Sequence, residues 1–244
     1  MVEWTDNAVV LSVRPHGETS AIVELLTEAY GRHAGLVRGG RSKSQRATLQ
    51  PGNEVRAHWR ARLSEHLGTL TLDLIRDRSA VYLDDPDRLA GLTSACATVT
   101  VLLPEREPHR TISDGFKALI NAMDETPNWP AGLVRFELGL LSELGFGLDL
   151  SQCAATGATH DLVYVSPKTG RAVSGGAGAP YKDRLLALPA FLQPGANLPP
   201  DINQALQGLQ LTGFFIKREL LDPQGAKLPA ARERLIERLK RRAL

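Results

Sequence analysis

A glycine pair surrounded by basic side chains stands between two strand-like segments. Residues 35–52 read GLVRGGRSKSQRATLQPG, in which Gly39-Gly40 is flanked by Arg38, Arg41, Lys43 and Arg46. Glycine lets the backbone turn and approach another group closely, and basic side chains suit phosphate. The loop is a candidate for holding the phosphate of a nucleotide or of a nucleic-acid backbone, and the alternative is a solvated surface.

The spacing excludes a nucleotide-binding P-loop. That motif needs G-x-x-x-x-G-K-[ST] between a strand and a helix. Lys43-Ser44 resembles its end, but Ser42 rather than glycine precedes the lysine. No apolar run that ends in aspartate follows at a suitable distance. The phosphates of a nucleic-acid backbone are therefore the better match for this loop.

Patterns for catalysis are missing as well. A nuclease would gather several carboxylates around metal ions, and the acid cluster Asp84-Asp85-x-Asp87 stands instead at an expected helix start, where acids favour the helix dipole. The sequence contains neither G-x-S-x-G nor H-E-x-x-H. We expect no enzymatic activity and no cofactor.

Charge is unevenly spread along the chain. The net charge is only +2, but residues 32–62 hold eight basic residues against one acid, and residues 227–244 hold seven against two. Two basic ends around an acidic middle favour contact with a polyanion. The cysteines, Cys96 and Cys153, cannot form a disulfide framework, so we expect a cytoplasmic location. No apolar run approaches the length of a membrane helix.

The first third of the chain reads as strands. Val55, Ala57 and Trp59 alternate with Arg56, His58, Arg60 and Arg62, which places the basic side chains on one face. Short strands separated by glycine and proline predict a small antiparallel barrel, and the five-stranded OB-fold commonly binds nucleic acid. The expected strands are 8–13, 19–27, 32–38, 54–63 and 69–74. An aromatic stacking platform is not evident beside the arginines, although Tyr30 stands at a strand end.

The remainder of the chain has helical length and spacing. Helices are expected near 86–103, 111–125, 130–146, 201–221 and 228–244. The fold class is therefore α+β and multi-domain, with an OB-fold nucleic-acid-binding domain at 1–80 and a helical domain at 81–244. The last helix ends in Arg238, Lys240, Arg241 and Arg242. These side chains either form a secondary DNA-binding surface or complement the helix dipole.

An ordered set of short motifs surrounds the glycine pair. The set is Arg14-Pro15-x-x-Glu18-Thr19-Ser20, Leu26-Thr27, Gly31-Arg32, Gly35-Leu36-Val37, Gly39-Gly40-Arg41 and Leu49-Gln50-Pro51. It resembles the amino-terminal signature of the bacterial RecO family of DNA repair and recombination mediator proteins. Further along, Phe136-Glu137-Leu138-x-Leu140-Leu141-x-x-Leu144-Gly145-Phe146, with Leu150 and Cys153 after it, resembles the helix that leads into the family's small metal-binding insertion.

The insertion, at about 150–178, is expected to bind no zinc. The resemblance implies two C-x-x-C pairs around a hairpin, which here reads Val165-Ser166-Pro167-x-x-Gly170. Cys153 remains, but Thr156 stands at its partner's position, and Ser174 and Ala177 stand at those of the second pair. Four-coordinate zinc needs four ligands, and adding His160 to Cys153 does not supply them. Cys153 is expected to be a small buried side chain.

The resemblance implies a non-catalytic function on DNA. It implies binding of single- and double-stranded DNA without sequence specificity, annealing of complementary strands, and, with RecR, loading of RecA onto DNA coated by single-stranded-DNA-binding protein, whose C-terminal tail would be a partner. The expected location is then the bacterial nucleoid. The expected DNA-binding residues are Arg14, Arg32, Arg38, Arg41, Lys43, Arg46, Arg56, Arg60 and Arg62. An RNA-binding OB-fold protein and a protein-interaction scaffold are the alternatives.

Overall fold

The computed structural model describes residues 1–196 and 199–243, so Leu244, the last residue of the final predicted helix, lies outside it. The chain forms two compact units, Met1–Asp114 with Pro229–Leu235, and Gly115–Leu228 with Ile236–Leu244. No helix within the described residues has the length and apolar character to span a membrane.

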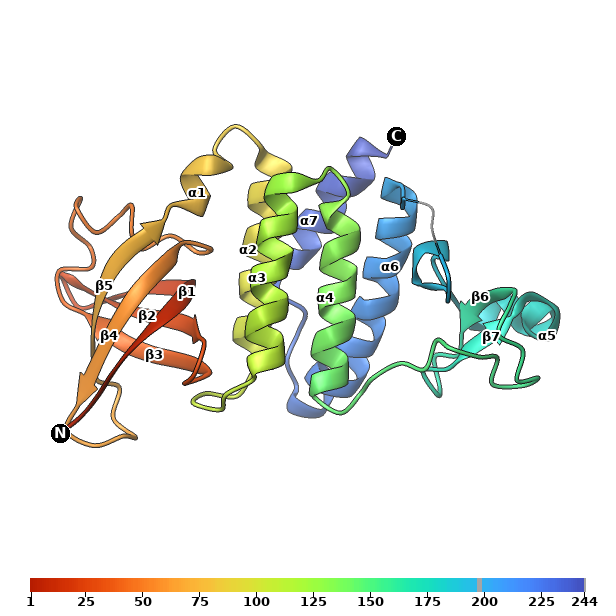
Figure 1. Ribbon diagram of the computed structural model, residues 1–244, viewed down its shortest axis with the longest axis horizontal. Coiled ribbons are helices and arrows are strands. Elements are labelled where there is room, and N and C mark those ends of the chain that lie inside the picture. The colour runs from red at the N-terminus through yellow and green to blue at the C-terminus, as the bar shows by residue number, and fades with distance from the viewer. Residues whose placement is uncertain (197–198, 244) are drawn as a thin grey trace. The chain divides into compact units, whose positions relative to one another are not determined.

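The first unit is built on a closed β-barrel (Figure 1). Its strands are β1 (Val2–His16), β2 (Ser20–Thr27), β3 (Arg32–Val37), β4 (Glu54–Ala61) and β5 (Thr69–Arg76). They follow the order β1-β2-β3-β5-β4, and β1 also pairs with β4 to close the barrel. Neighbouring strands are antiparallel apart from β3 and β5, which meet in parallel at Leu36 and Thr69. The expectation of a small OB-type barrel in an α+β chain is confirmed.

The alternation along the strands builds the barrel core. Val55, Ala57 and Trp59 of β4 are buried, while Arg56 and Arg60 between them are exposed. Leu63, which continues the apolar alternation in the sequence, is 42% exposed. It lies beyond the end of β4, where the strand geometry that turns alternate side chains inward no longer applies.

Two helices follow the barrel within the first unit. They are α1 (Arg78–Val81) and α2 (Pro86–Leu102). The Asp85 side chain accepts a hydrogen bond from the backbone N–H of Arg88 at 3.0 Å and so caps α2. This gives the acid cluster a structural role. The buried Cys96 side chain of α2 lies 3.7 Å from the carbonyl oxygen of Val10, which fixes the helix against β1.

Helices α4 (Trp129–Glu143) and α6 (Ile202–Phe215) pack together in the second unit. Leu133, Phe136, Leu140 and Leu141 are buried on α4, as their spacing predicts. The buried carboxylate of Glu137 accepts a hydrogen bond from the Thr212 hydroxyl of α6. The segment predicted as one helix at 201–221 changes character at Ile216, where π-helical geometry continues to Leu221.

The other elements complete the chain. Helix α3 (Arg110–Glu125) runs from the first unit into the second, and α7 (Ala230–Arg242) is likewise divided between them. In the insertion, β6 (Leu162–Val165) and β7 (Ala172–Ser174) form the predicted hairpin, followed by the short helix α5 (Gly175–Gly178). Strand β8 (Leu186–Ala187), which the sequence did not predict, adds to the other side of β6.

Candidate nucleic-acid interface

The loop after β3 is fastened to the turn between β1 and β2. The backbone N–H of Arg41 donates to the carbonyl oxygen of Thr19 at 3.0 Å, and its guanidinium donates to that of Gly17 at 3.0 Å. Gly39 has a positive φ of 67°, and a Cβ on Gly40 would lie 2.9 Å from the Cβ of Ala21. The glycine pair therefore lets the loop approach its own hairpin.

The basic side chains of this loop point into solvent. Arg38, Lys43 and Arg46 are exposed, and so is Arg14 on β1 near the same hairpin. Within the described part of the chain, Arg38, Lys43 and Arg46 make no ion pair. Their charges are thus available to an anion. We call Arg14, Arg38, Arg41, Lys43 and Arg46 the loop cluster.

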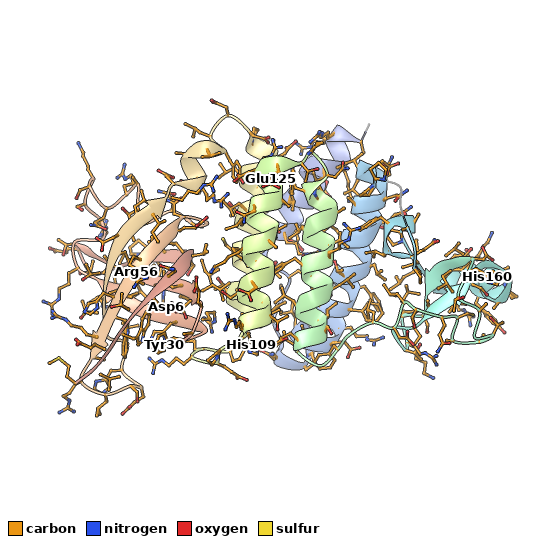
Figure 2. All side chains as sticks on the ribbon, in the orientation of Figure 1. Asp6, Tyr30, Arg56, His109, Glu125 and His160 are labelled. Atoms are coloured by element: carbon orange, nitrogen blue, oxygen red, sulfur yellow. The ribbon has the colours of Figure 1, made fainter. Side chains whose placement is uncertain are left out.

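The outer face of β4, with Arg62 just beyond its end, carries the second basic group. Arg56, Arg60 and Arg62 are exposed, and Figure 2 labels Arg56 on the barrel. Arg56 donates to the Oδ1 atom of Asn7 at 3.0 Å. His58, between the arginines, lies 2.9 Å from the Thr5 hydroxyl through its Nδ1 atom. We call Arg56, Arg60 and Arg62 the strand cluster.

The strand register relates the two clusters. Thr69 of β5 lies opposite Arg60 of β4 on one side and opposite Leu36 of β3 on the other. Arg60 and Leu36 of β3, which lies two residues before Arg38, are therefore two strand spacings apart, or about 10 Å. Arg60 and the strand that leads into the loop cluster are thus separated by a distance that a phosphodiester backbone spans in a few nucleotides.

Arg32 has a different environment from the other candidates. Its guanidinium pairs with the carboxylate of Glu24 and, at 3.5 Å, with that of Glu105. Its Nε atom donates to the carbonyl oxygen of Leu103 at 2.8 Å. The side chain is half-buried, so its charge is largely used in joining β3 to β2 and to the segment after α2.

The basic end of α7 is a separate surface. Arg238, Lys240, Arg241 and Arg242 are exposed. Lys240 pairs with Glu237 at 2.8 Å, and this hydrogen bond is the main reason that the pKa of Glu237 is lowered. Part of the charge at this end is therefore balanced within the helix.

Three aromatic side chains that are far apart in the sequence meet in the barrel. Tyr30, Trp4 and Trp59 stack in that order, with ring centroids 4.6 Å apart for the first pair and 5.8 Å for the second. The sequence suggested Tyr30 alone, and it indicated no platform because the three residues come from different strands and turns. Only the pairing of Trp4 with Trp59 in the β1–β4 register brings them together. We call these residues the aromatic column.

Hydrogen bonds join Cys153 to Ser174 in the insertion. Cys153 is buried, and its Sγ atom accepts from the backbone N–H and the hydroxyl of Ser174 at 3.3 and 3.4 Å. Burial acts to raise the pKa of this thiol, but hydrogen bonds from Ser174, Thr156 and Ala155 outweigh it and lower the pKa to about 6. Among the described residues, no group of three or more metal-binding side chains gathers.

Comparisons with known proteins cover both units. The family model described as "Recombination protein O N terminal" matches residues 1–77, and "Recombination protein O C terminal" matches residues 83–227. The chain is 51% identical to the DNA repair protein RecO of Rhodospirillum rubrum over 246 residues, covering 99% of this chain and 98% of the relative. It is 54% identical to that of Rhodospirillum centenum over 242 residues, covering 98% of this chain and 96% of the relative. The RecO of Mesorhizobium japonicum is 48% identical over 240 residues, or 98% and 94% of the two chains.

Proposed function

Because the chain belongs to the RecO family of DNA repair proteins, we propose that it is a non-catalytic recombination mediator that binds DNA through its barrel. The observation that carries the proposal is the pair of basic clusters on one OB-type barrel. Their side chains are exposed, and most of the loop cluster is unbalanced by acids. Such a surface attracts phosphates without reading base sequence.

The proposed site consists of the loop cluster and the strand cluster, with Arg32 in a supporting role. Arg32 positions β3, from which the loop departs, through its carboxylate partners. The basic end of α7 is the proposed secondary site. Both single and double strands present the phosphate spacing that such clusters neutralise, so we propose binding of both forms.

The partners are proposed from the family. With RecR, the chain would help to load RecA onto DNA coated by single-stranded-DNA-binding protein, and it would bind the C-terminal tail of that coating protein. It would also anneal complementary strands. We propose that it acts at the nucleoid, in the cytoplasm.

Annealing of coated strands tests the proposal. Two complementary DNA strands, each covered by single-stranded-DNA-binding protein, are mixed with and without the chain, and duplex formation is followed by fluorescence energy transfer. We expect the chain to accelerate annealing, because a mediator acts on the coated strand, whereas a generic DNA binder is blocked by the coating. Annealing of the coated strands that is no faster with the chain would contradict the proposal, whatever happens on bare DNA.

Two controls separate the alternatives. A protein-interaction scaffold would show no affinity for bare DNA even at low salt. An RNA-binding protein would be displaced from labelled DNA more readily by RNA than by DNA of the same sequence. The proposed function requires DNA to be the better competitor.

A further inference from the structure

The aromatic column ends at the surface of the barrel. Tyr30 is 39% exposed, whereas Trp4 and Trp59 are 7% and 1% exposed. The ring planes of Tyr30 and Trp4 differ by 12°, and those of Trp4 and Trp59 by 15°, so the three rings lie almost parallel. The column thus continues from the core outward, and its last ring is accessible. Figure 2 labels Tyr30 on the barrel.

A cavity of about 270 Å³ lies beside the column. Its wall is mainly apolar, and its lining residues are Val2, Trp4, Ala29, Tyr30, His33, Trp59, Ser64, Arg106 and Pro108. Ligand sites of drug-like size measure about 300–1,000 Å³. The volume therefore suits a single ring system with its immediate substituents.

Polar groups in the cavity wall have unused hydrogen-bonding capacity. Within the described residues, neither ring nitrogen of His33 makes a hydrogen bond of good geometry, and neither does the Nε atom of Arg106. His33 is only 4% exposed and stands nearly perpendicular to both indole rings. Unsatisfied buried polar groups are uncommon in folded proteins, and a missing ligand is one reason for them.

The fold holds this wall in place. Arg106 has a positive φ of 63°, and its guanidinium donates to the carbonyl oxygens of Ser64 and His66 at 2.6 and 2.8 Å. Its backbone N–H donates to the carbonyl oxygen of Arg32 at 2.7 Å. A non-glycine residue in this conformation is strained, and such strain is concentrated at functional sites.

The indole of Trp59 is held by the segment that follows β4. Its Nε1 atom donates to the carbonyl oxygen of Leu67 at 2.9 Å. The next residue, Gly68, has a positive φ of 67°, and a Cβ there would lie 2.4 Å from the indole ring. Glycine at this position allows the backbone to lie directly against the indole ring. This contact and the hydrogen bond to Leu67 hold the Trp59 ring of the column in its stacked position.

We propose that this cavity receives one unstacked nucleobase of a single DNA strand, which stacks on the aromatic column at Tyr30 with its edge toward Arg106 and His33. This inference rests on the proposed function and adds to it a subsite for a base. Aromatic rings present flat faces to bases of every kind. The unpartnered Nε–H of Arg106 suits the carbonyl oxygens and ring nitrogens of a base edge.

Basic residues that are close in sequence to the cavity wall agree with this occupant. The exposed Arg60 directly follows Trp59, and the exposed Arg62 lies two residues before Ser64, and both Trp59 and Ser64 line the cavity. A strand whose phosphates contact these arginines would therefore pass near the cavity. An apolar peptide end would leave the Arg106 Nε atom without a partner, so the observations favour the base.

Binding to strands with and without bases tests the proposal. We compare a thymidine oligonucleotide with a base-free strand of the same length and charge, using fluorescence anisotropy with the full chain and with Tyr30→Ala. We expect Tyr30→Ala to weaken binding of the thymidine strand about tenfold, because one stacked base contributes on that order. Its affinity for the base-free strand should not change. Tyr181→Ala, which removes another exposed tyrosine, is the matched control and should change neither.

Each other outcome overturns the inference. Equal loss for both strands would mean that Tyr30 supports the barrel rather than a base, and unchanged binding of the thymidine strand would mean that no base stacks there. The two outcomes above would leave the proposed function intact. If the wild-type chain bound neither strand, the proposed function itself would be wrong.

Photocrosslinking gives a second measurement on the unaltered chain. An oligonucleotide that carries 5-iodouracil is irradiated in the complex, and the attached peptide is identified by mass spectrometry. We expect attachment at Tyr30 or Trp4. Attachment only at residues outside the cavity would contradict the proposed subsite.

Discussion

Burial of His33 makes the barrel sensitive to acid. Removal from water is the main reason that the pKa of this imidazole is lowered to about 4, and the charge of Arg106 lowers it further against the opposing effects of Glu105 and the Tyr30 backbone. The folded chain therefore favours the neutral ring. As the pH falls below the ordinary value of 6.5, the unfolded chain takes up the proton first, and stability decreases until about pH 4.

We expect His33→Gln to remove this part of the acid sensitivity. Between pH 7.5 and pH 5, the wild-type chain should lose about 1–2 kcal/mol more of its unfolding free energy than the variant does, as a single shifted histidine predicts. Urea unfolding at the two pH values measures the difference. His66→Gln changes an exposed imidazole and should behave like the wild type. Equal acid sensitivity of His33→Gln and wild type would show that the pKa of His33 is the same in the folded and the unfolded chain.

At the scale of the elements, local signals determine where helices begin. Asp85 caps α2 through the backbone N–H of Arg88, and its carboxylate also pairs with the Arg88 guanidinium. These hydrogen bonds outweigh the effect of partial burial and lower the pKa of Asp85. The cap therefore holds at neutral pH, where the carboxylate is ionised.

We expect Asp85→Ala to destabilise the first unit by about 1 kcal/mol, the usual contribution of such a cap. Asp84→Ala, which removes the neighbouring exposed acid, should change the unfolding free energy little. Thermal and urea unfolding of both variants measure the difference. Equal stability of the two variants would mean that the cap contributes nothing beyond the surface charge.

The strands could be predicted because alternation or short apolar runs mark them. The five predicted barrel strands overlap β1 to β5. Residues 54–63 and 69–74 alternate, and the first three segments are apolar runs bounded by turn residues, although residues 2–7 of β1 were not predicted. Strand β8 has only two residues, and the π-helical segment after α6 has ordinary helical spacing, so neither has a sequence signal of its own.

The aromatic column could not be predicted in this way. Trp4 and Trp59 look like separate core residues until the β1–β4 register places them opposite each other, and Arg106 joins them from a loop after α2. Pairing between distant segments depends on tertiary packing, which single-sequence periodicity does not describe. The basic clusters were easier to find, because exposed charge requires no partner to be recognised.

For the whole molecule, local charge matters more than net charge. A net charge of +2 gives a weak overall attraction for a polyanion, and salt screens exposed charges beyond about 10 Å. Binding should therefore depend on which basic group is altered. The barrel clusters and the end of α7 are the two candidates.

We expect charge reversal of Arg38, Lys43 and Arg46 to glutamate to weaken binding of single-stranded DNA and to reduce the slope of log Kd against log salt by about 2, the value for three lost contacts. Arg41 is left unchanged because it holds the loop to Gly17. Fluorescence anisotropy across a salt series measures the slope.

Two further variants complete this test. Lys168 of the insertion and Lys182 and Arg184 just after it are exposed basic residues. Their reversal changes the net charge equally, so it should leave the slope almost unchanged. Reversal of Lys240, Arg241 and Arg242 examines α7. If the α7 variant showed the smaller slope of log Kd against log salt and the loop variant showed the wild-type slope, the main DNA site would lie on α7.

The contacts of Arg32 and Arg106 determine how the chain can be divided. The first family model ends at residue 77, but two residues with roles in the barrel unit lie well beyond it. Glu105 pairs with Arg32, and Arg106 lines the cavity beside Trp59. A fragment that ends at residue 77 would keep every barrel strand and most of the basic surface, yet it would leave Arg32 without one of its carboxylates and the cavity without a wall. We therefore expect such a fragment to keep the proposed phosphate contacts and to lose the proposed base contacts, so that truncation at residue 77 would separate the two.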